Sequence, residues 1–189
     1  MAAEPPARAL SVTSPRRRVR VLLVWWSMTD GTRQLAEAAA AGARAVADAH
    51  VAGEGHPIDV ELVEAPRAGP EHVLAADALV FATPENLASM AGMMKDFFDR
   101  TYYAVLGRVE GRPYASIVCA GSDGQGAARQ IDRIATGWRL RRVADPLVVI
   151  TNAQTPQAIL ATKRIGGADL ARAHDLGSAM AAGVSLGVW

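Results

Sequence analysis

Residues 19–32 read VRVLLVWWSMTDGT, an uninterrupted apolar run that ends in the hydroxyl residues Ser27, Thr29 and Thr32. A continuous apolar run is typical of a parallel strand that is buried on both faces. An alanine-rich stretch follows directly and predicts a helix. Free backbone N–H groups at the start of a helix favour an anion. The stretch therefore predicts a strand, a turn and a helix that together bind an anionic group.

The turn in this stretch has the spacing Ser-x-Thr-x-x-Thr, which places several hydroxyl donors around one point. It contributes no cationic side chain of its own. Neutral hydrogen-bond donors of this kind suit a phosphate monoester, so the turn is the first indication of a phosphorylated cofactor.

Strand-like apolar runs alternate with helical segments along the rest of the chain. Such alternation predicts a parallel sheet covered by helices on both faces, because right-handed crossovers place helices on each side. The predicted strands are residues 19–26, 58–64, 78–83, 114–121 and 146–151. The predicted helices lie near residues 30–50, 70–77, 91–106, 125–138 and 168–186.

The helical segments carry apolar stripes at three- and four-residue spacing, which we interpret as core-facing surfaces. The first stripe is narrow and made of small residues, which favours close packing on the sheet. It consists of Leu35, Ala39, Ala43 and Val46. The stripe of the third helix is wider and consists of Met90, Met94, Phe97, Phe98 and Thr101.

The composition predicts one globular domain. The chain has 189 residues, with 20 Lys and Arg against 19 Asp and Glu and a net charge of +1. A balanced charge predicts no nucleic-acid partner. No apolar run approaches the roughly 18 residues of a membrane span, so no membrane partner is expected. We expect the domain to occupy residues 19–189, after a disordered proline-containing extension at residues 1–18.

The single cysteine, Cys119, excludes an intrachain disulfide and any multi-cysteine metal site. A reducing cytoplasm is therefore the expected compartment. The four histidines show no ligand spacing, so no metal is expected.

Three loops rich in glycine, hydroxyl or other small residues leave predicted strand ends that face one edge of the sheet. They are Ser27–Thr32, Thr83–Met90 and Ala120–Gly126. In an open doubly wound sheet, ligands bind outside the carboxyl ends of the strands. Glycines such as those of the third loop let the backbone approach a ligand closely. The joint position of the loops predicts a ligand pocket there.

The segments SMTDGT (27–32), ATPENLASMAGMMKDFFDRTYY (82–103) and AGSDGQGAARQIDRIATGWRLR (120–141) resemble the flavodoxin-like family. The likeness is to its NAD(P)H-dependent FMN-reductase and quinone-reductase branches, and it covers roughly residues 19–151. It implies an α/β, three-layer, doubly wound fold with a five-stranded parallel sheet in the order 2-1-3-4-5. It also implies FMN as the cofactor, NADH or NADPH as the electron donor, and a possible homo-oligomer, either dimer or tetramer.

Carried over by position, the resemblance implies three groups of cofactor-binding residues. The ribityl phosphate would be held by Ser27, Thr29, Gly31 and Thr32. One side of the isoalloxazine ring would lie along Thr83, Pro84, Glu85, Asn86 and Leu87, and the other along Gly121, Ser122, Asp123 and Gly124.

Asp30 is a departure from the family pattern within the phosphate loop. The family usually has glycine directly after the second hydroxyl residue, whereas here the glycine is displaced to Gly31. A carboxylate beside a phosphate dianion repels it. Asp30 can also turn outward and cap the helix, a common use of aspartate at that position. We expect that replacing Asp30 by glycine tightens FMN binding.

No Ser-His-Asp or Cys-His set is apparent, so we expect no catalytic side chain, because flavin chemistry belongs to the cofactor. The sequence favours an oxidoreductase that passes electrons from NAD(P)H through FMN to a quinone or another small acceptor. One alternative is a non-enzymatic electron carrier of the flavodoxin type. Another is a binding or assembly module with a degraded flavin site, for which the candidate contacts are Tyr102, Tyr103, Trp138 and Trp189.

Overall fold

A computed structural model of the chain describes residues 17–50 and 54–189. Five parallel strands form the body of its sheet: β1 (Val19–Trp25), β2 (Ile58–Glu64), β3 (Ala78–Asn86), β5 (Pro113–Ala120) and β7 (Leu147–Ile150). The main path runs β2-β1-β3-β5, and β7 pairs with the far edge of β5. In chain order this is 2-1-3-4-5, so the predicted flavodoxin-like topology is confirmed.

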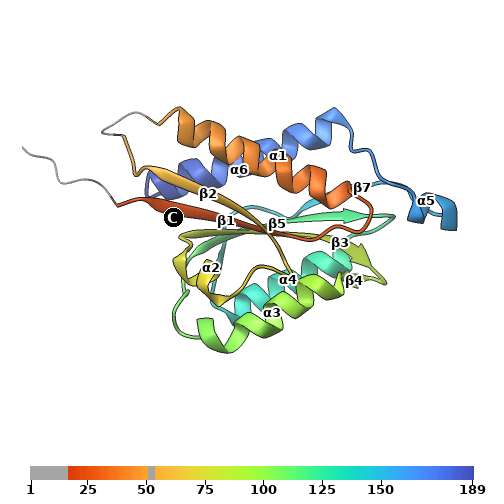
Figure 1. Ribbon diagram of the computed structural model, residues 1–189, viewed down its shortest axis with the longest axis horizontal. Coiled ribbons are helices and arrows are strands. Elements are labelled where there is room, and N and C mark those ends of the chain that lie inside the picture. Colours follow the sequence, from red (N-terminus) through yellow and green to blue (C-terminus); the bar gives the residue numbers. More distant parts are fainter. Residues whose placement is uncertain (1–16, 51–53) are drawn as a thin grey trace, which may run out of the picture.

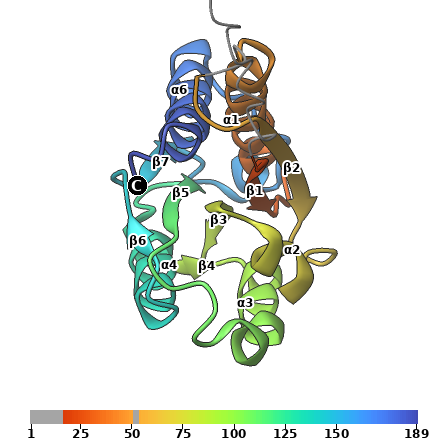
Figure 2. The same ribbon diagram turned by 90° about the vertical axis from the view of Figure 1, so that its left-hand side faces the viewer.

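Helices cover both faces of the sheet (Figure 1). One face carries α1 (Gly31–Asp48) and α6 (Gly167–Ser185), and the other carries α2 (Pro70–Ala75), α3 (Gly92–Val105) and α4 (Gln125–Gly137). Figure 2 shows the same three layers from the end of the molecule. Each face has its own hydrophobic core, because the strands are apolar on both sides.

Three short elements were not predicted from the sequence. Strand β4 (Ser89–Met90) forms a hairpin with the end of β3. Strand β6 (Arg141–Arg142) pairs with the beginning of β5, and β7 pairs with the end of β5 on the same edge. Helix α5 (Pro156–Leu160) has no buried residue. These elements are too short to give a periodic signal.

The predicted stripes of the first and third helices lie in the core. All five residues predicted for the third-helix stripe are buried, and its phenylalanines pack with Phe81 and Trp138. Met90, however, lies in β4, before α3 begins at Gly92. The small-residue stripe of α1 is also largely buried, with Leu35, Ala39 and Ala43 fully so. It meets α6 as well as the sheet, and the two helices approach so closely that a Cβ on Gly177 would lie 1.8 Å from the carbonyl oxygen of Ala39.

The proposed contact residues of the assembly-module alternative divide into buried and exposed groups. Trp138 is buried among core aromatics, so it offers no surface to a second subunit. Trp189 packs against α6 at Gly183. Tyr102 and Tyr103 are exposed and stack edge to face on each other.

Two further expectations concern the N-terminal extension and membrane-spanning segments. Most of the expected extension at residues 1–18 lies outside the described residues, so its disorder stays a prediction. In the part of the chain that the structure describes, no helix combines the length and apolar character needed to cross a membrane.

Candidate flavin site

The three predicted loops meet at the carboxyl edge of the sheet around a cavity of about 560 Å³. The first loop follows β1, the second continues from β3 into the β3–β4 hairpin, and the third follows β5. The lining residues that the sequence pointed to are Ser27, Thr29, Gly31, Thr32, Pro84, Glu85, Asn86, Leu87, Gly121 and Ser122.

The first loop ends at the start of α1, where the backbone N–H groups of the first turn have no partners within the helix. Gly31 lies deep in this loop, because a Cβ built on it would approach the Cys119 sulfur to 2.7 Å. The Thr32 hydroxyl is buried, lines the cavity and has no hydrogen-bond partner in the described part of the chain. A buried polar group without a partner is costly, so this hydroxyl indicates a missing acceptor.

Asp30 precedes α1 in a left-handed backbone conformation, with φ of 65°. This conformation favours glycine and is tolerated by aspartate, which explains why the turn accepts Asp30. Its carboxylate accepts a hydrogen bond from Nε of Arg33 at 2.9 Å and makes no capping bond to the helix. This hydrogen bond lowers the pKa of the Asp30 carboxyl. Asp30 does not line the cavity.

The second loop is built differently from the expected strand exit. Strand β3 continues through Pro84 to Asn86 and turns only at Leu87 and Ala88. The buried Thr83 hydroxyl accepts a hydrogen bond from the Ala91 amide at 3.1 Å, which fixes the base of the hairpin. Thr83 therefore supports the loop from below and does not line the cavity.

The Leu87–Ala88 turn has an unusual backbone. Both residues have positive φ, 53° and 56°, in a two-residue hairpin loop, which is the pattern of a type I′ turn. Such turns favour Asn-Gly, and a leucine in this conformation is strained. The Leu87 side chain is fully exposed at the cavity mouth. The strain is not offset by burial of this side chain.

Glu85 joins the second loop to the third. Its carboxylate accepts hydrogen bonds from the amides of Gly124 at 2.7 Å and Ala127 at 3.2 Å, at the start of α4. A carboxylate in this position satisfies two unpaired helix N–H groups and complements the helix dipole. Gly124 is buried beneath this contact with a positive φ, and the exposed Asp123 lies outside the cavity.

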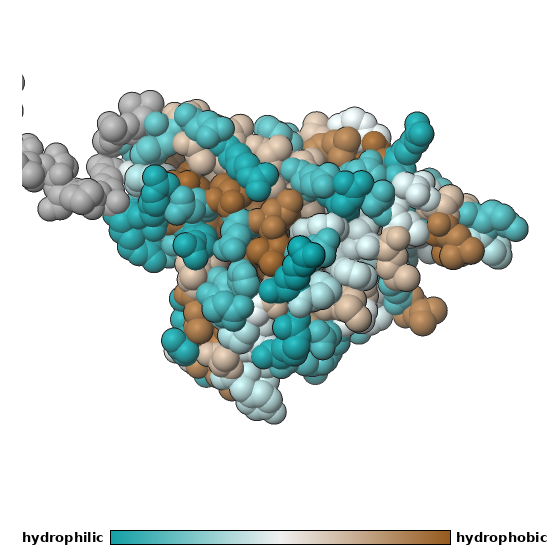
Figure 3. All heavy atoms as spheres, viewed as in Figure 1, coloured by the Kyte–Doolittle hydropathy of each residue, from teal (hydrophilic) through white to brown (hydrophobic). Residues whose placement is uncertain are grey.

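A fourth wall was not predicted from the sequence. It is formed by the segment 151–165, which connects β7 to α6 and includes α5, and we call it the strap. The strap contributes Thr151, Ala153, Ile159, Leu160 and Lys163 to the cavity lining. Ile159 and Leu160 are exposed. Figure 3 shows a small hydrophobic patch among hydrophilic residues at the end of the molecule that carries α5. A run such as NAQTPQAILATKRIGG has no periodic signal, so only the tertiary structure reveals this wall.

Four further residues line the cavity: Met28, Ala88, Cys119 and Ala120. Met28, Ala88 and Ala120 lie in the predicted loops but were not named as individual site residues, whereas Cys119 lies outside these loops. Cys119 is buried beneath the first loop, and burial raises the pKa of its thiol to about 11. The thiol is therefore neutral at physiological pH.

The cavity lining suits a ligand that has both a phosphate group and an apolar part. One end of the cavity offers helix N–H groups and the unpartnered Thr32 hydroxyl, which suit a phosphate. The lining also includes exposed apolar side chains, among them Met28, Leu87 and Ile159. The doubly wound sheet and this pocket at its carboxyl edge define a flavodoxin-like protein.

Comparison with known proteins defines the family more narrowly. The sequence model of the family described as NADPH-dependent FMN reductase matches residues 27–155, and the chain belongs to this family. FMN with NAD(P)H, expected from the sequence, agrees with the description of that family. The strap beyond residue 155, including Lys163, lies outside the matched segment.

Two curated relatives and one solved structure extend the comparison. A flavodoxin of Aquifex aeolicus is 33% identical over 107 residues, which cover 57% of this chain and 51% of its own. An NAD(P)H dehydrogenase (quinone) of Acidithiobacillus ferrooxidans is 32% identical over 100 residues, 43% of this chain and 46% of its own. The chain thus spans about half the length of these relatives. An archaeal flavodoxin structure has a TM-score of 0.67 at 17% identity, covering 88% of this chain and 99% of its own, which supports the fold.

Proposed function

We propose that this protein binds FMN in the cavity at the sheet edge and transfers electrons from NAD(P)H to a quinone or a similarly flat small acceptor. The observation that carries the proposal is the buried Thr32 hydroxyl, which has no partner in the described residues and lies at the start of α1. A phosphate at that point would accept hydrogen bonds from this hydroxyl and from the first-turn amides of α1.

Each wall of the cavity has a distinct part in this proposal. Ser27, Thr29, Gly31 and Thr32 hold the phosphate. Pro84, Glu85, Asn86 and Leu87 lie along one side of the ring, and Gly121 and Ser122 lie along the other. When bound, FMN would supply the redox chemistry between the nicotinamide and the acceptor, since that chemistry belongs to the cofactor. The protein positions both reactants and shields the ring from water on the sheet side.

The cavity mouth favours an enzyme over an electron carrier. The lining residues found in the described chain include no aromatic side chain that would cover the ring face. The rim instead carries the exposed apolar side chains of Met28, Leu87, Ile159 and Leu160. An open ring face with an apolar rim lets a nicotinamide and then a quinone approach in turn, because both are flat and partly apolar.

The test begins with the absorbance spectrum of the protein during titration with FMN, followed by steady-state assays with NADH or NADPH and a benzoquinone. We expect a bound flavin spectrum and turnover. Thr32→Val should weaken FMN binding at least tenfold and leave riboflavin binding nearly unchanged, because it removes a donor to the phosphate. Flavin binding without turnover would favour the electron carrier, and no flavin binding would favour the assembly module.

A further inference from the structure

A lysine of the strap lies directly beside the proposed phosphate loop. The Lys163 amide donates a hydrogen bond to the Thr29 carbonyl at 2.8 Å. The Gln34 side chain holds the strap from α1, since its Nε2 donates to the Lys163 carbonyl at 2.7 Å and its Oε1 accepts from the Ile165 amide at 3.1 Å. The backbone of Lys163 is therefore fixed to both the loop and the helix that follows it.

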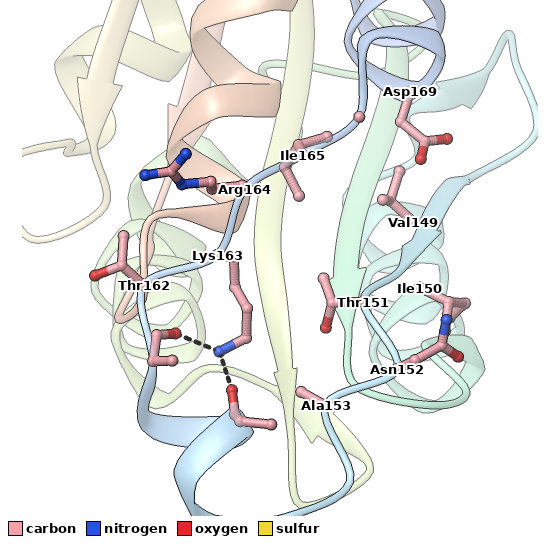
Figure 4. Close-up of a pocket in the computed structure, with 13 residues that line it drawn as sticks. Val149, Ile150, Thr151, Asn152, Ala153, Thr162, Lys163, Arg164, Ile165 and Asp169 are labelled. Carbon is pink, nitrogen blue, oxygen red and sulfur yellow. Dashed lines mark hydrogen bonds between the residues drawn. The ribbon is translucent and has the colours of Figure 1, made fainter.

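The Lys163 side chain runs along the loop into the cavity. A Cβ built on Gly31 would lie 3.3 Å from Cβ and 3.4 Å from Cγ of Lys163, so the aliphatic stem packs on the loop backbone. Lys163 lines a neighbouring cavity of about 440 Å³, which is bordered by both ends of the strap, for example Thr151 and Ile165 (Figure 4). Lys163 also lines the candidate flavin cavity, together with the phosphate-loop residues Thr29 and Thr32.

The ammonium group of Lys163 has only neutral partners. It donates to the carbonyl oxygens of Ala158 at 2.7 Å and Ile159 at 2.8 Å, and to that of Ala161. Figure 4 shows it directed towards α5. Within residues 17–50 and 54–189, no carboxylate forms a salt bridge with it. A full positive charge at the cavity wall is therefore not neutralised by the protein.

The phosphate loop and the lysine complement each other. The loop supplies amides and hydroxyl groups, including the unpartnered Thr32 hydroxyl, but no cation that lines the cavity. A phosphate monoester carries close to two negative charges at neutral pH. Charge-assisted hydrogen bonds from a lysine to phosphate are stronger than those from neutral donors.

We propose that Lys163 is the cationic partner of the FMN phosphate, and that its ammonium group turns from the α5 carbonyls to the phosphate when the cofactor binds. This inference rests on the proposed function. It makes Lys163 a specificity residue: it distinguishes FMN, which carries the phosphate, from riboflavin, which does not. The residue lies outside the segment matched by the family model, so the chain supplies this charge from its own strap.

The test compares FMN and riboflavin affinities of the wild type, Lys163→Gln and Lys163→Arg, measured by quenching of flavin fluorescence. Glutamine removes the charge but keeps N–H donors for the α5 carbonyls, so the strap should stay in place. We expect Lys163→Gln to weaken FMN binding at least tenfold and to leave riboflavin binding within twofold. Lys163→Arg should restore most of the FMN affinity.

The matched control is Arg164→Gln, which removes a neighbouring exposed charge that does not line the FMN cavity. It should leave both affinities within twofold. The FMN affinity of the wild type should also fall more steeply with added salt than that of Lys163→Gln.

The outcomes separate the two proposals. If the wild type binds neither flavin, the proposed function fails and this inference fails with it. If the wild type binds FMN, an equal loss of FMN and riboflavin in Lys163→Gln shows that Lys163 only positions the strap, and unchanged FMN affinity shows that it does not meet the phosphate. Either result overturns the inference and leaves the proposed function intact.

Discussion

The Glu85 carboxylate accepts a hydrogen bond from the Gly124 amide at 2.7 Å, which ties together two loops whose residues are 39 positions apart. One loop leaves β3 and the other leaves β5, and both line the candidate flavin cavity. The contact therefore fixes the width of the cavity as well as the start of α4. Glu85 also accepts a hydrogen bond from the Ala127 amide, and both hydrogen bonds affect FMN binding as well as stability.

Replacing Glu85 by alanine should lower both the unfolding free energy and the FMN affinity. Two helix N–H groups lose their acceptor, which costs about 2 kcal/mol. Glu85→Gln, which keeps one acceptor oxygen, should cost about half as much. Chemical denaturation and FMN titration measure the two effects. Asp123→Ala is the matched control, because this exposed carboxylate lies in the same loop and outside the cavity, and a loss as large as that of Glu85→Ala would contradict our assignment.

The strained turn at Leu87 and Ala88 predicts a gain of stability on substitution. Leu87→Asn combined with Ala88→Gly supplies the residues that a type I′ turn favours, and should raise the unfolding free energy by about 1 kcal/mol. Leu87→Ala should not change stability, because it keeps the positive φ and the leucine side chain is fully exposed. Thermal unfolding of the three proteins makes this comparison.

The same variants test the role of the Leu87 side chain. If it contributes to the apolar rim for the acceptor, both substitutions should raise the KM for benzoquinone several-fold while the KM for NAD(P)H changes less. Unchanged quinone kinetics in both variants would mean that Leu87 does not contact the acceptor, and the strain of the turn would then have no explanation in the proposed reaction.

The sequence was sufficient for the parts of the fold that repeat a local pattern. The strands and helices around the sheet follow from apolar runs and three- to four-residue spacing, and the three loops follow from small and hydroxyl residues at strand ends. The remaining features depend on distant contacts. Gln34 holds the backbone around Lys163 from 129 residues away, and no local pattern encodes that contact. The β3 strand continues through Pro84 because this residue pairs with Cys119 of β5, which a proline at a predicted strand exit does not indicate.

Close packing of α1 against α6 predicts a severe effect of a single methyl group. A Cβ on Gly177 would lie 1.8 Å from the Ala39 carbonyl oxygen, so Gly177→Ala forces the helices apart and should cost about 3 kcal/mol. Gly137→Ala is the control, because a Cβ there meets nothing within 4 Å. Its stability should be unchanged or higher by up to about 1 kcal/mol, since alanine favours helix. Similar denaturation midpoints for the two variants would show that the helices are not in close contact.

The buried thiol of Cys119 predicts a pH dependence of chemical modification. Because burial raises its pKa to about 11, the reactive thiolate is scarce at pH 8 and becomes about tenfold more abundant with each pH unit up to pH 10. Reaction with Ellman's reagent should therefore be slow at pH 8 and accelerate accordingly. Bound FMN should slow it further, because Cys119 lines the cavity. The protein unfolded in guanidinium is the control and should react at once, whereas rapid reaction of the folded protein at pH 7 would contradict the assignment.

Asp30 affects the phosphate loop in two ways, through the charge of its carboxylate and through the positive φ of its backbone. Substitutions at this position can distinguish the two effects. Its carboxylate pairs with Arg33, which reduces its repulsion of a phosphate without removing it. Asp30→Gly should therefore tighten FMN binding about two- to fivefold and leave riboflavin binding unchanged. It should also raise the melting temperature, because glycine adopts the left-handed conformation without strain.

Asp30→Asn is the control that keeps a side chain and removes the charge. Equal gains in FMN affinity for the asparagine and glycine variants would assign the effect to the carboxylate. A gain in the glycine variant alone would assign it to the backbone, since asparagine has nearly the same side chain as aspartate. Isothermal titration with FMN and riboflavin distinguishes these results, and identical FMN affinities for all three proteins would mean that the Arg33 ion pair already neutralises Asp30 towards the phosphate.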